Sequence, residues 1–204
     1  HHQPRRQRQM CIRDSAYAII PVFPSRAFRH GALFVRDDRG IETPEDLKGK
    51  TIGLFDFEMT AALVARGMLN DEHQILASDI NWVVGAVEDA SDHIPQGDTN
   101  NKLKGVDISP VPNGWSLNSL LADGQIDGIV GLYEPSCMAT GAPVKRLFSD
   151  WRTAEQDYFL RTGIFPIMHT VAIRKSLLAE NPWIAQSVYN AFCEAKEMAL
   201  AELQ

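Results

Sequence analysis

The stretch TPEDLKGKTIGLFDFEMTAALVARGML, residues 43–69, decides the fold class of this chain. Thr43 and Pro44, followed by acidic residues, are typical of a helix N-terminus. Residues 51–55 form an apolar run that predicts a β-strand, and residues 59–69 place apolar side chains at helical spacing. A strand that leads directly into a helix is the repeating unit of an α/β fold.

The same alternation of strands and helices continues on both sides of this stretch. Further strands are predicted over residues 16–23, 31–36, 81–85, 126–131, 144–148 and 164–174, and further helices after Ser116 and after Pro182. Two of the extended runs, 31–36 and 164–174, bracket a self-contained α/β block. This arrangement predicts one lobe inserted into another, with two crossing strands as the hinge.

The predicted domain organisation has three parts. Residues 1–15 differ in composition from the remainder, and we treat them as an unstructured tail or a foreign leader. Residues 16–36 and 164–204 form a partial outer lobe, lobe 1, and residues 37–163 form the inserted α/β lobe, lobe 2. Because the outer lobe is too small to bury its own faces, we expect the chain to be a fragment that lacks an N-terminal portion of this lobe.

Composition and charge exclude several classes of protein. With 204 residues, 45% of them apolar and 23% charged, the chain has the composition of a globular protein, not of a disordered chain, a collagen or a disulfide scaffold. The net charge is −6, and the remainder is more acidic still once the basic residues 1–15 are set aside. Such a body repels phosphate backbones, so no nucleic-acid partner is expected. An anionic ligand then needs a local cationic pocket.

The cysteines and the hydropathy pattern bear on metal binding, membrane spans and cellular location. Cys11, Cys137 and Cys193 show no metal-ligand spacing, so we expect reduced thiols and no metal site. No stretch approaches the roughly 20 apolar residues of a membrane span. The apolar run 16–23 is broken by Pro21 and does not resemble a signal peptide. We therefore expect a cytoplasmic protein, or a periplasmic one if a missing N-terminal portion carries a signal peptide.

The densest group of candidate functional residues is PVFPSRAFRH, residues 21–30, which contains Arg26, Arg29 and His30. Arginine binds carboxylates through two parallel hydrogen bonds, and histidine exchanges a proton near neutral pH. Together these residues predict a site for an anionic small molecule that can take up a proton. A solvated basic loop is the alternative interpretation.

A second group, around residues 161–169, contains Arg161, Thr162 and His169 in largely apolar surroundings. It predicts a guanidinium and an imidazole in a cleft that holds little water. A histidine that is simply hydrogen-bonded within a core is the alternative for His169.

Three further candidates follow predicted strands, where the ligand-binding loops of α/β proteins lie. Thr60 is expected to donate a hydrogen bond to a ligand at a helix N-terminus, although Asp56 and Glu58 nearby disfavour an anion there. Ser136 is a candidate substrate-binding residue, and Glu134 a candidate proton donor if burial raises its pKa. We expect Cys137 to be a small buried residue.

The same residues carry a resemblance to a known family. The matching strings are PVFPSRAFRH (21–30), TPEDLKGKTIG (43–53), EMTAALVARGML (58–69), the acid Glu88, LLADGQIDGIVG (120–131), PSC (135–137), RLFSD (146–150), RTGIFPIMH (161–169) and NPW (181–183). Over residues 16–204 the chain resembles the 4,5-dihydroxyphthalate decarboxylase family, relatives of periplasmic solute-binding proteins with the type II two-lobed fold. DLKGKTIG is shared widely among type II solute-binding proteins, whereas the first string and RTGIFPIMH are more specific.

The resemblance implies a lyase that removes one carboxylate from a dihydroxylated aromatic dicarboxylate. This chemistry formally requires no organic cofactor, and we expect none. In the mechanism that we expect, Arg26, Arg29 and Arg161 hold the two carboxylates, and His30 or His169 is the general acid. The expected partner is a small aromatic carboxylate, and homo-oligomer formation is left open.

Two other functions use the same fold. A solute-binding component of an ABC-type importer would capture a small organic anion in the same cleft without chemistry. A pyrimidine-precursor synthase of the thiamine pathway would need a cysteine-rich motif, which this sequence lacks.

Overall fold

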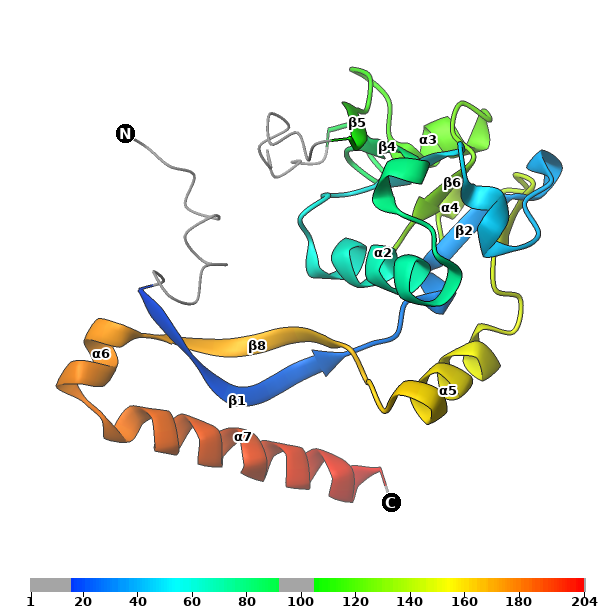
Figure 1. The fold of residues 1–204 in the computed structure, drawn as a ribbon. Coiled ribbons are helices and arrows are strands. Elements are labelled where there is room, and N and C mark those ends of the chain that lie inside the picture. Colours follow the sequence, from blue (N-terminus) through cyan, green and yellow to red (C-terminus); the bar gives the residue numbers. More distant parts are fainter. Residues whose placement is uncertain (1–15, 92–104, 204) are drawn as a thin grey trace. The chain divides into compact units, whose positions relative to one another are not determined.

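The computed structural model describes residues 16–91 and 105–203, and these fall into two compact units. Unit 1 comprises residues 16–27 and 167–203, and unit 2 comprises residues 28–166. The chain therefore leaves unit 1 after Ala27 and returns to it after Pro166. Each unit has its own sheet (Figure 1).

Unit 2 is built on a six-stranded sheet in the order β5-β4-β3-β6-β2-β7. Its strands are β2 (Leu33–Arg36), β3 (Thr51–Leu54), β4 (Asn81–Val84), β5 (Asp107–Pro110), β6 (Gly128–Val130) and β7 (Val144–Arg146). Strands β3, β4, β5 and β6 run parallel, and β2 runs antiparallel to its neighbours β6 and β7. Short 3-10 helices join them, namely η1 (His30–Ala32), η2 (Asp37–Arg39), η3 (Pro44–Leu47) and η4 (Ala77–Asp79).

Helices cover both faces of this sheet. Side chains alternate between the faces along each strand, so that Leu33 joins one hydrophobic cluster and Phe34 the other. Helix α2 (Thr60–His73) packs on the first face through residues such as Ala62 and Leu69. Helices α3 (Leu117–Ala122) and α4 (Ser136–Ala139) pack on the second (Figure 1). The α/β character predicted from the sequence is confirmed.

Local sequence signals account for several element boundaries. The predicted helix start at Thr43 is confirmed, because the Asp46 carboxylate accepts hydrogen bonds from the Thr43 backbone and hydroxyl at 2.8 and 3.0 Å. Ser116 caps α3 by accepting a hydrogen bond from the Ser119 backbone N–H at 3.1 Å. Helix α5 (Trp151–Thr162) was not predicted from the sequence.

Strand β2 lies elsewhere than the sequence analysis placed it. Residues 31–36 were expected to be a crossing strand of the outer lobe, but Leu33 pairs with Val130 of β6 and Phe34 with Arg146 of β7. All four residues of β2 are buried, which fits a strand inside a sheet. The division at Phe28 therefore differs from the predicted boundary at residue 37. The assignment of the two units to lobes of a longer protein stays a prediction.

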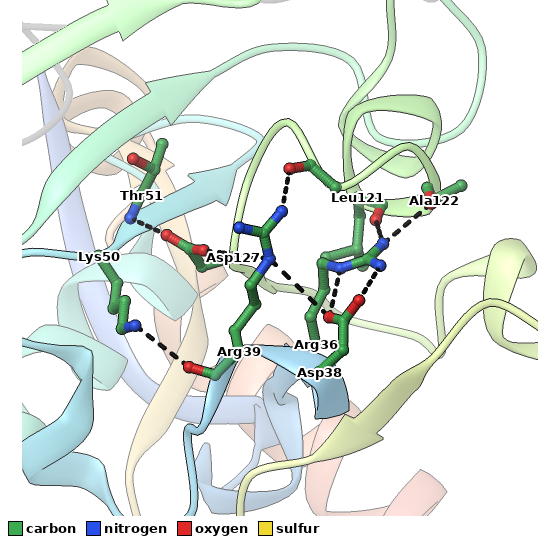
Figure 2. A network of polar contacts seen from close by, with 9 residues as sticks. Arg36, Asp38, Arg39, Lys50, Thr51, Leu121, Ala122 and Asp127 are labelled. Carbon is green, nitrogen blue, oxygen red and sulfur yellow. Dashed lines mark hydrogen bonds and ion pairs between the residues drawn. The ribbon is translucent and has the colours of Figure 1, made fainter.

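A polar network secures the sheet edge at which β2 ends. Arg36 is only 7% exposed and donates hydrogen bonds to both oxygens of Asp38, at 2.8 and 2.6 Å. Its Nη1 also donates to the carbonyl oxygens of Leu121 and Ala122, at 2.7 and 2.9 Å (Figure 2). These bonds tie the end of β2 to the last turn of α3. A buried guanidinium with four internal hydrogen bonds is expected to stabilise this edge of the sheet.

Unit 1 consists of two long antiparallel strands and two helices. Strand β1 (Tyr17–Arg26) pairs with β8 (Ile167–Arg174), and α6 (Lys175–Glu180) and α7 (Trp183–Glu202) follow. Ile20, Val22 and Ile173 form its small buried cluster. Large apolar side chains of α7 remain exposed, among them Trp183 at 66%.

A glycine in β6 supplies a test of the packing between strands. A Cβ atom at Gly128 would lie 2.6 Å from the backbone oxygen of Phe34, so we expect Gly128→Ala to lower the free energy of unfolding by about 1–3 kcal/mol. The matched control is Gly67→Ala within α2, where a Cβ meets nothing within 4 Å. This control should gain about 0.5–1 kcal/mol. Urea unfolding measures the free energy of unfolding of both variants, and an equal change in the two would contradict the packing described.

The network around Arg36 supplies a second test. Lysine cannot reproduce the fork of hydrogen bonds that Arg36 makes, so we expect Arg36→Lys to lower the free energy of unfolding by about 1–3 kcal/mol. The control Arg39→Lys changes a side chain that is 42% exposed and should cost less than about 1 kcal/mol. Urea unfolding of the two variants side by side is the measurement. A smaller loss for Arg36→Lys than for the control would be inconsistent with the network.

Candidate functional site

The sheet topology brings five loops to one edge of unit 2. Strands β3, β4, β6 and β7 end at this edge, and β2 begins there because it runs antiparallel to β6. The loops concerned, which we call the carboxyl edge, are residues 28–32, 55–59, 85–88, 131–135 and 147–150. Ligands of α/β proteins bind outside the carboxyl ends of the parallel strands.

His30 is the most deeply buried of the predicted site residues, with 2% of its surface exposed. Its Nε2 lies 3.4 Å from Oε2 of Glu72 on α2. The imidazole packs edge-on against the rings of Phe148 and Tyr158, at centroid distances of 5.2 and 5.4 Å. Burial lowers the pKa of His30 below its usual value, and the hydrogen bond and charge of Glu72 act in the opposite direction.

Glu72 links two of the predicted residues, although the sequence analysis did not select it. Its Oε1 accepts a hydrogen bond at 2.8 Å from Nη2 of Arg161, while its Oε2 faces His30. The side chain of Glu72 is 10% exposed and that of Arg161 is 59% exposed. His30, Glu72 and Arg161 therefore form a chain of polar contacts from the interior to the surface. Nothing in the run NDEH at the end of α2 distinguishes Glu72 from an ordinary surface acid.

Arg29 and Glu155 form a second group beside η1. Burial lowers the pKa of the Arg29 guanidinium, and the charge of Glu155 opposes this effect. Burial likewise raises the pKa of Glu155, whose Oε1 accepts a hydrogen bond from the Gly31 backbone at 3.3 Å. Glu155 lies on α5, which the sequence analysis missed. The available signal was Asp150, which caps α5 by accepting a hydrogen bond from the Thr153 backbone at 3.2 Å.

Arg146 is a further cation of this region that the sequence analysis did not select. It donates hydrogen bonds to the carbonyl oxygen of Gly31 and to Oε1 of Glu134, the latter at 2.6 Å. The side chain of Glu134 is 59% exposed. The burial on which its predicted role as proton donor depended is therefore not found, and its carboxylate is held by a guanidinium.

Ser136 is the first residue of α4, and Glu88 holds it at two atoms. The Ser136 hydroxyl donates to Oε2 of Glu88 at 2.5 Å, and its backbone N–H donates to Oε1 at 3.2 Å. Cys137 is 4% exposed, and burial is the main factor that raises its pKa. The interpretation of Cys137 as a small buried residue is confirmed. Its backbone N–H donates to Oδ1 of Asn118 at 2.8 Å.

The two predicted threonines lie at opposite ends of their helices. Thr60 is the first residue of α2 and is partly buried. Thr162 is the last residue of α5, where its hydroxyl donates to the Tyr158 carbonyl at 2.8 Å and accepts from the Ile164 backbone at 3.1 Å. The hydroxyl of Thr162 is therefore engaged at the helix end, and a role in ligand binding stays a prediction for both residues.

Arg26 and His169 belong to unit 1, whereas the other predicted residues belong to unit 2. In the ladder of β1 and β8, His169 pairs with Ser25, and Arg26 pairs with Ile167. Both side chains are exposed, and the Arg26 guanidinium lies over the Phe23 ring at 5.5 Å. The structure thus brings His30 and Arg161 together through Glu72 within unit 2, and Arg26 and His169 close together within unit 1.

Cavities, metal ligands and membrane spans were sought in the described residues. A pocket of about 670 Å³ in unit 1 is lined by residues such as Tyr17, Arg174 and Val188 and includes none of the predicted site residues. Because charge and hydrogen bonding gather elsewhere, we place the candidate site at the carboxyl edge. Residues 16–91 and 105–203 contain no group of three or more potential metal ligands. No helix in those ranges has the length and apolar character of a membrane span.

Comparison with solved structures defines the class of fold. The periplasmic aliphatic sulphonate-binding protein SsuA of Escherichia coli matches 96% of this chain and 52% of its own, with a TM-score of 0.51 and 12% sequence identity. A family model described as NMT1/THI5 like matches residues 27–103. The chain thus has the periplasmic-binding-protein-like α/β fold, as predicted.

Comparison with curated proteins identifies the relatives within this class. A 4,5-dihydroxyphthalate decarboxylase of Comamonas testosteroni is 44% identical over 193 residues, which are 93% of this chain and 57% of that protein. A protein of the same name from Pseudomonas putida is 38% identical over 152 residues, 71% of this chain and 56% of that protein. The resemblance to the 4,5-dihydroxyphthalate decarboxylase family is confirmed. The chain spans a little over half the length of these curated relatives.

The buried imidazole of His30 predicts how stability depends on pH. Because folding lowers the pKa of His30, the unfolded chain takes up a proton first as the pH falls below 6.5, and the free energy of unfolding should decrease there. Each pKa unit between the two states corresponds to about 1.4 kcal/mol. We expect His30→Gln to flatten this dependence in urea unfolding measured from neutral to mildly acidic pH. An unchanged slope in the variant would show that His30 is not the group responsible.

Proposed function

We propose that the protein containing this chain is a carboxy-lyase that acts on 4,5-dihydroxyphthalate or a closely similar dihydroxylated aromatic dicarboxylate. The observation that carries the proposal is the 44% identity over 93% of the chain to a protein named 4,5-dihydroxyphthalate decarboxylase. The carboxyl edge supports it, because Arg29, His30 and Arg146 gather there in an otherwise acidic chain. A dicarboxylate needs such a local concentration of positive charge.

The proposed reaction exchanges a carbon–carbon bond for a carbon–hydrogen bond. A ring hydroxyl para to one carboxylate pushes electron density into the ring, and the ring carbon that bears the carboxylate takes up a proton. The bond to the carboxylate then breaks, its electron pair returns to the ring, and carbon dioxide leaves. The net change consumes one proton and releases one carbon dioxide, with no change of oxidation state that would call for a redox partner.

The proposed roles follow from the charges of the side chains. Arg26, Arg29 and Arg161 hold the two carboxylates through paired hydrogen bonds, and His30 or His169 supplies the proton to the ring carbon. Arg161 can serve in this way because its side chain is 59% exposed while one of its nitrogens holds Glu72. The substrate is a small aromatic carboxylate, and the proposed location of the enzyme is the cytoplasm.

Separate replacement of the two candidate acids tests the proposal. In the full-length protein, His30→Gln or His169→Gln should lower the rate of carbon dioxide release from 4,5-dihydroxyphthalate by about 10²–10⁴-fold, the usual contribution of a general acid. His73→Gln is the comparison variant, because it removes a neighbouring imidazole that contacts Glu45 at 3.2 Å and has no proposed role in proton transfer, so its effect on turnover should be much smaller. Undiminished turnover in both His30→Gln and His169→Gln would remove the proposed acids.

The importer component remains the second candidate function, favoured only by the fold shared with SsuA. Measurements of binding and of carbon dioxide release together separate the two candidate functions. A binding protein would take up 4,5-dihydroxyphthalate in isothermal titration and release no carbon dioxide. A decarboxylase would release carbon dioxide with multiple turnovers.

A further inference from the structure

Glu72 is the carboxylate that joins His30 to Arg161, and the role argued for it below rests on the proposed function. Oε2 of Glu72 lies 3.4 Å from Nε2 of His30, and Oε1 accepts a hydrogen bond from Arg161 at 2.8 Å. The three residues come from η1, α2 and α5, which are distant in sequence. An acid that bridges a buried imidazole and a guanidinium can control the orientation of the imidazole.

The contact with Glu72 determines which nitrogen of His30 carries hydrogen. An ionised carboxylate only accepts hydrogen bonds, so Nε2 must donate to it. In neutral His30 the hydrogen is then on Nε2, and Nδ1 keeps its lone pair. The distance of 3.4 Å is at the long end for a hydrogen bond, and such contacts commonly shorten when a ligand binds.

The other nitrogen of His30 is the atom left for a ligand. Nδ1 is buried and has no hydrogen-bond partner among the residues that the structure describes. A buried polar atom without a partner costs about 1–3 kcal/mol, so a site that retains one has a use for it or fills it with water. The aromatic rings of Phe148 and Tyr158 beside the imidazole leave an apolar environment in which a proton transfer is little disturbed by solvent.

We propose that Glu72 is a positioning residue, which holds His30 by Nε2 so that the proton of the reaction is carried by Nδ1. In the charged form of His30, Nε2–H stays on Glu72 and Nδ1–H faces the substrate. Nδ1 gives its proton to the ring carbon, the bond to the carboxylate then breaks and carbon dioxide leaves, and Nδ1 regains a proton from solvent water. Arg161 holds Glu72 in place through its hydrogen bond to Oε1.

The charged groups around His30 predict opposite effects for two variants. Glu72 raises the pKa of His30, whereas His73, which follows it on α2, and Arg161 on α5 lower it. Tyr158, whose side chain is also titratable, packs against the imidazole as well. Removal of the Glu72 charge should therefore favour neutral His30, and removal of the Arg161 charge should favour charged His30.

The pH profile of turnover tests the positioning role. A general acid loses activity as the pH rises through its pKa, so we expect Glu72→Gln to move the falling limb of kcat to lower pH and to lower kcat by about tenfold or more at neutral pH. Arg161→Gln should move the same limb to higher pH, although its KM should rise if it also holds a carboxylate. If Glu72 has a purely structural role, the falling limb of kcat in both variants should stay at the wild-type pH. This result would overturn the inference.

Nuclear magnetic resonance of the full-length protein tests the inference without turnover. With ¹⁵N-labelled histidine, and His30→Gln for assignment, the neutral His30 ring should show hydrogen on Nε2, and Glu72→Gln should lower its pKa. Hydrogen on Nδ1 in the wild type would overturn the inference, even if Glu72→Gln failed to fold. Correct tautomer and pKa shift in a protein that releases no carbon dioxide would instead reject the proposed function and retain the placement of the proton.

Discussion

The antiparallel position of β2 between β6 and β7 is the constraint on which the rest of unit 2 depends. If β2 ran parallel to its neighbours, the loop that carries Arg29 and His30 would lie at the other edge of the sheet. Because Leu33 pairs with Val130, this loop instead lies beside the ends of β3, β4 and β6. The direction of β2 thus separates the sheet edge held by Arg36 from the carboxyl edge, at which we place the candidate site. All four residues of β2 are buried, so its side chains fill both faces of the sheet at this position.

Charge at the candidate site is arranged in pairs, with few groups left to solvent alone. Glu72 faces Arg161, Glu134 faces Arg146, and the charge of Glu155 acts on Arg29. This pairing explains how an acidic protein concentrates guanidinium groups without mutual repulsion. It also implies that the proposed dicarboxylate would compete with internal acids for the same cations, which favours ligands that engage more than one arginine.

Much of the fold could be predicted from the sequence, and less of the site. Strands such as β3 and caps such as Ser116 are local features, and hydrophobic spacing reveals them. Helix α5 was missed because none of its residues is buried, so it carries no apolar stripe. His30 and Arg161 were predicted because each lies in a short motif rich in basic residues or histidine. Glu72 was not predicted, because its contact with His30 joins α2 to η1 and no local pattern encodes it. The direction of β2 was missed for the same reason.

The two ends of unit 2 meet. Phe28 stacks on Phe165 with ring centroids 4.8 Å apart, and the chain joins unit 1 within two residues of each ring. A segment whose termini are already in contact loses little conformational freedom when those termini are anchored to a host chain. Unit 2 is therefore suited to insertion into another chain, because its two ends already lie together. For the same reason, its ends could be joined and new termini opened elsewhere by circular permutation.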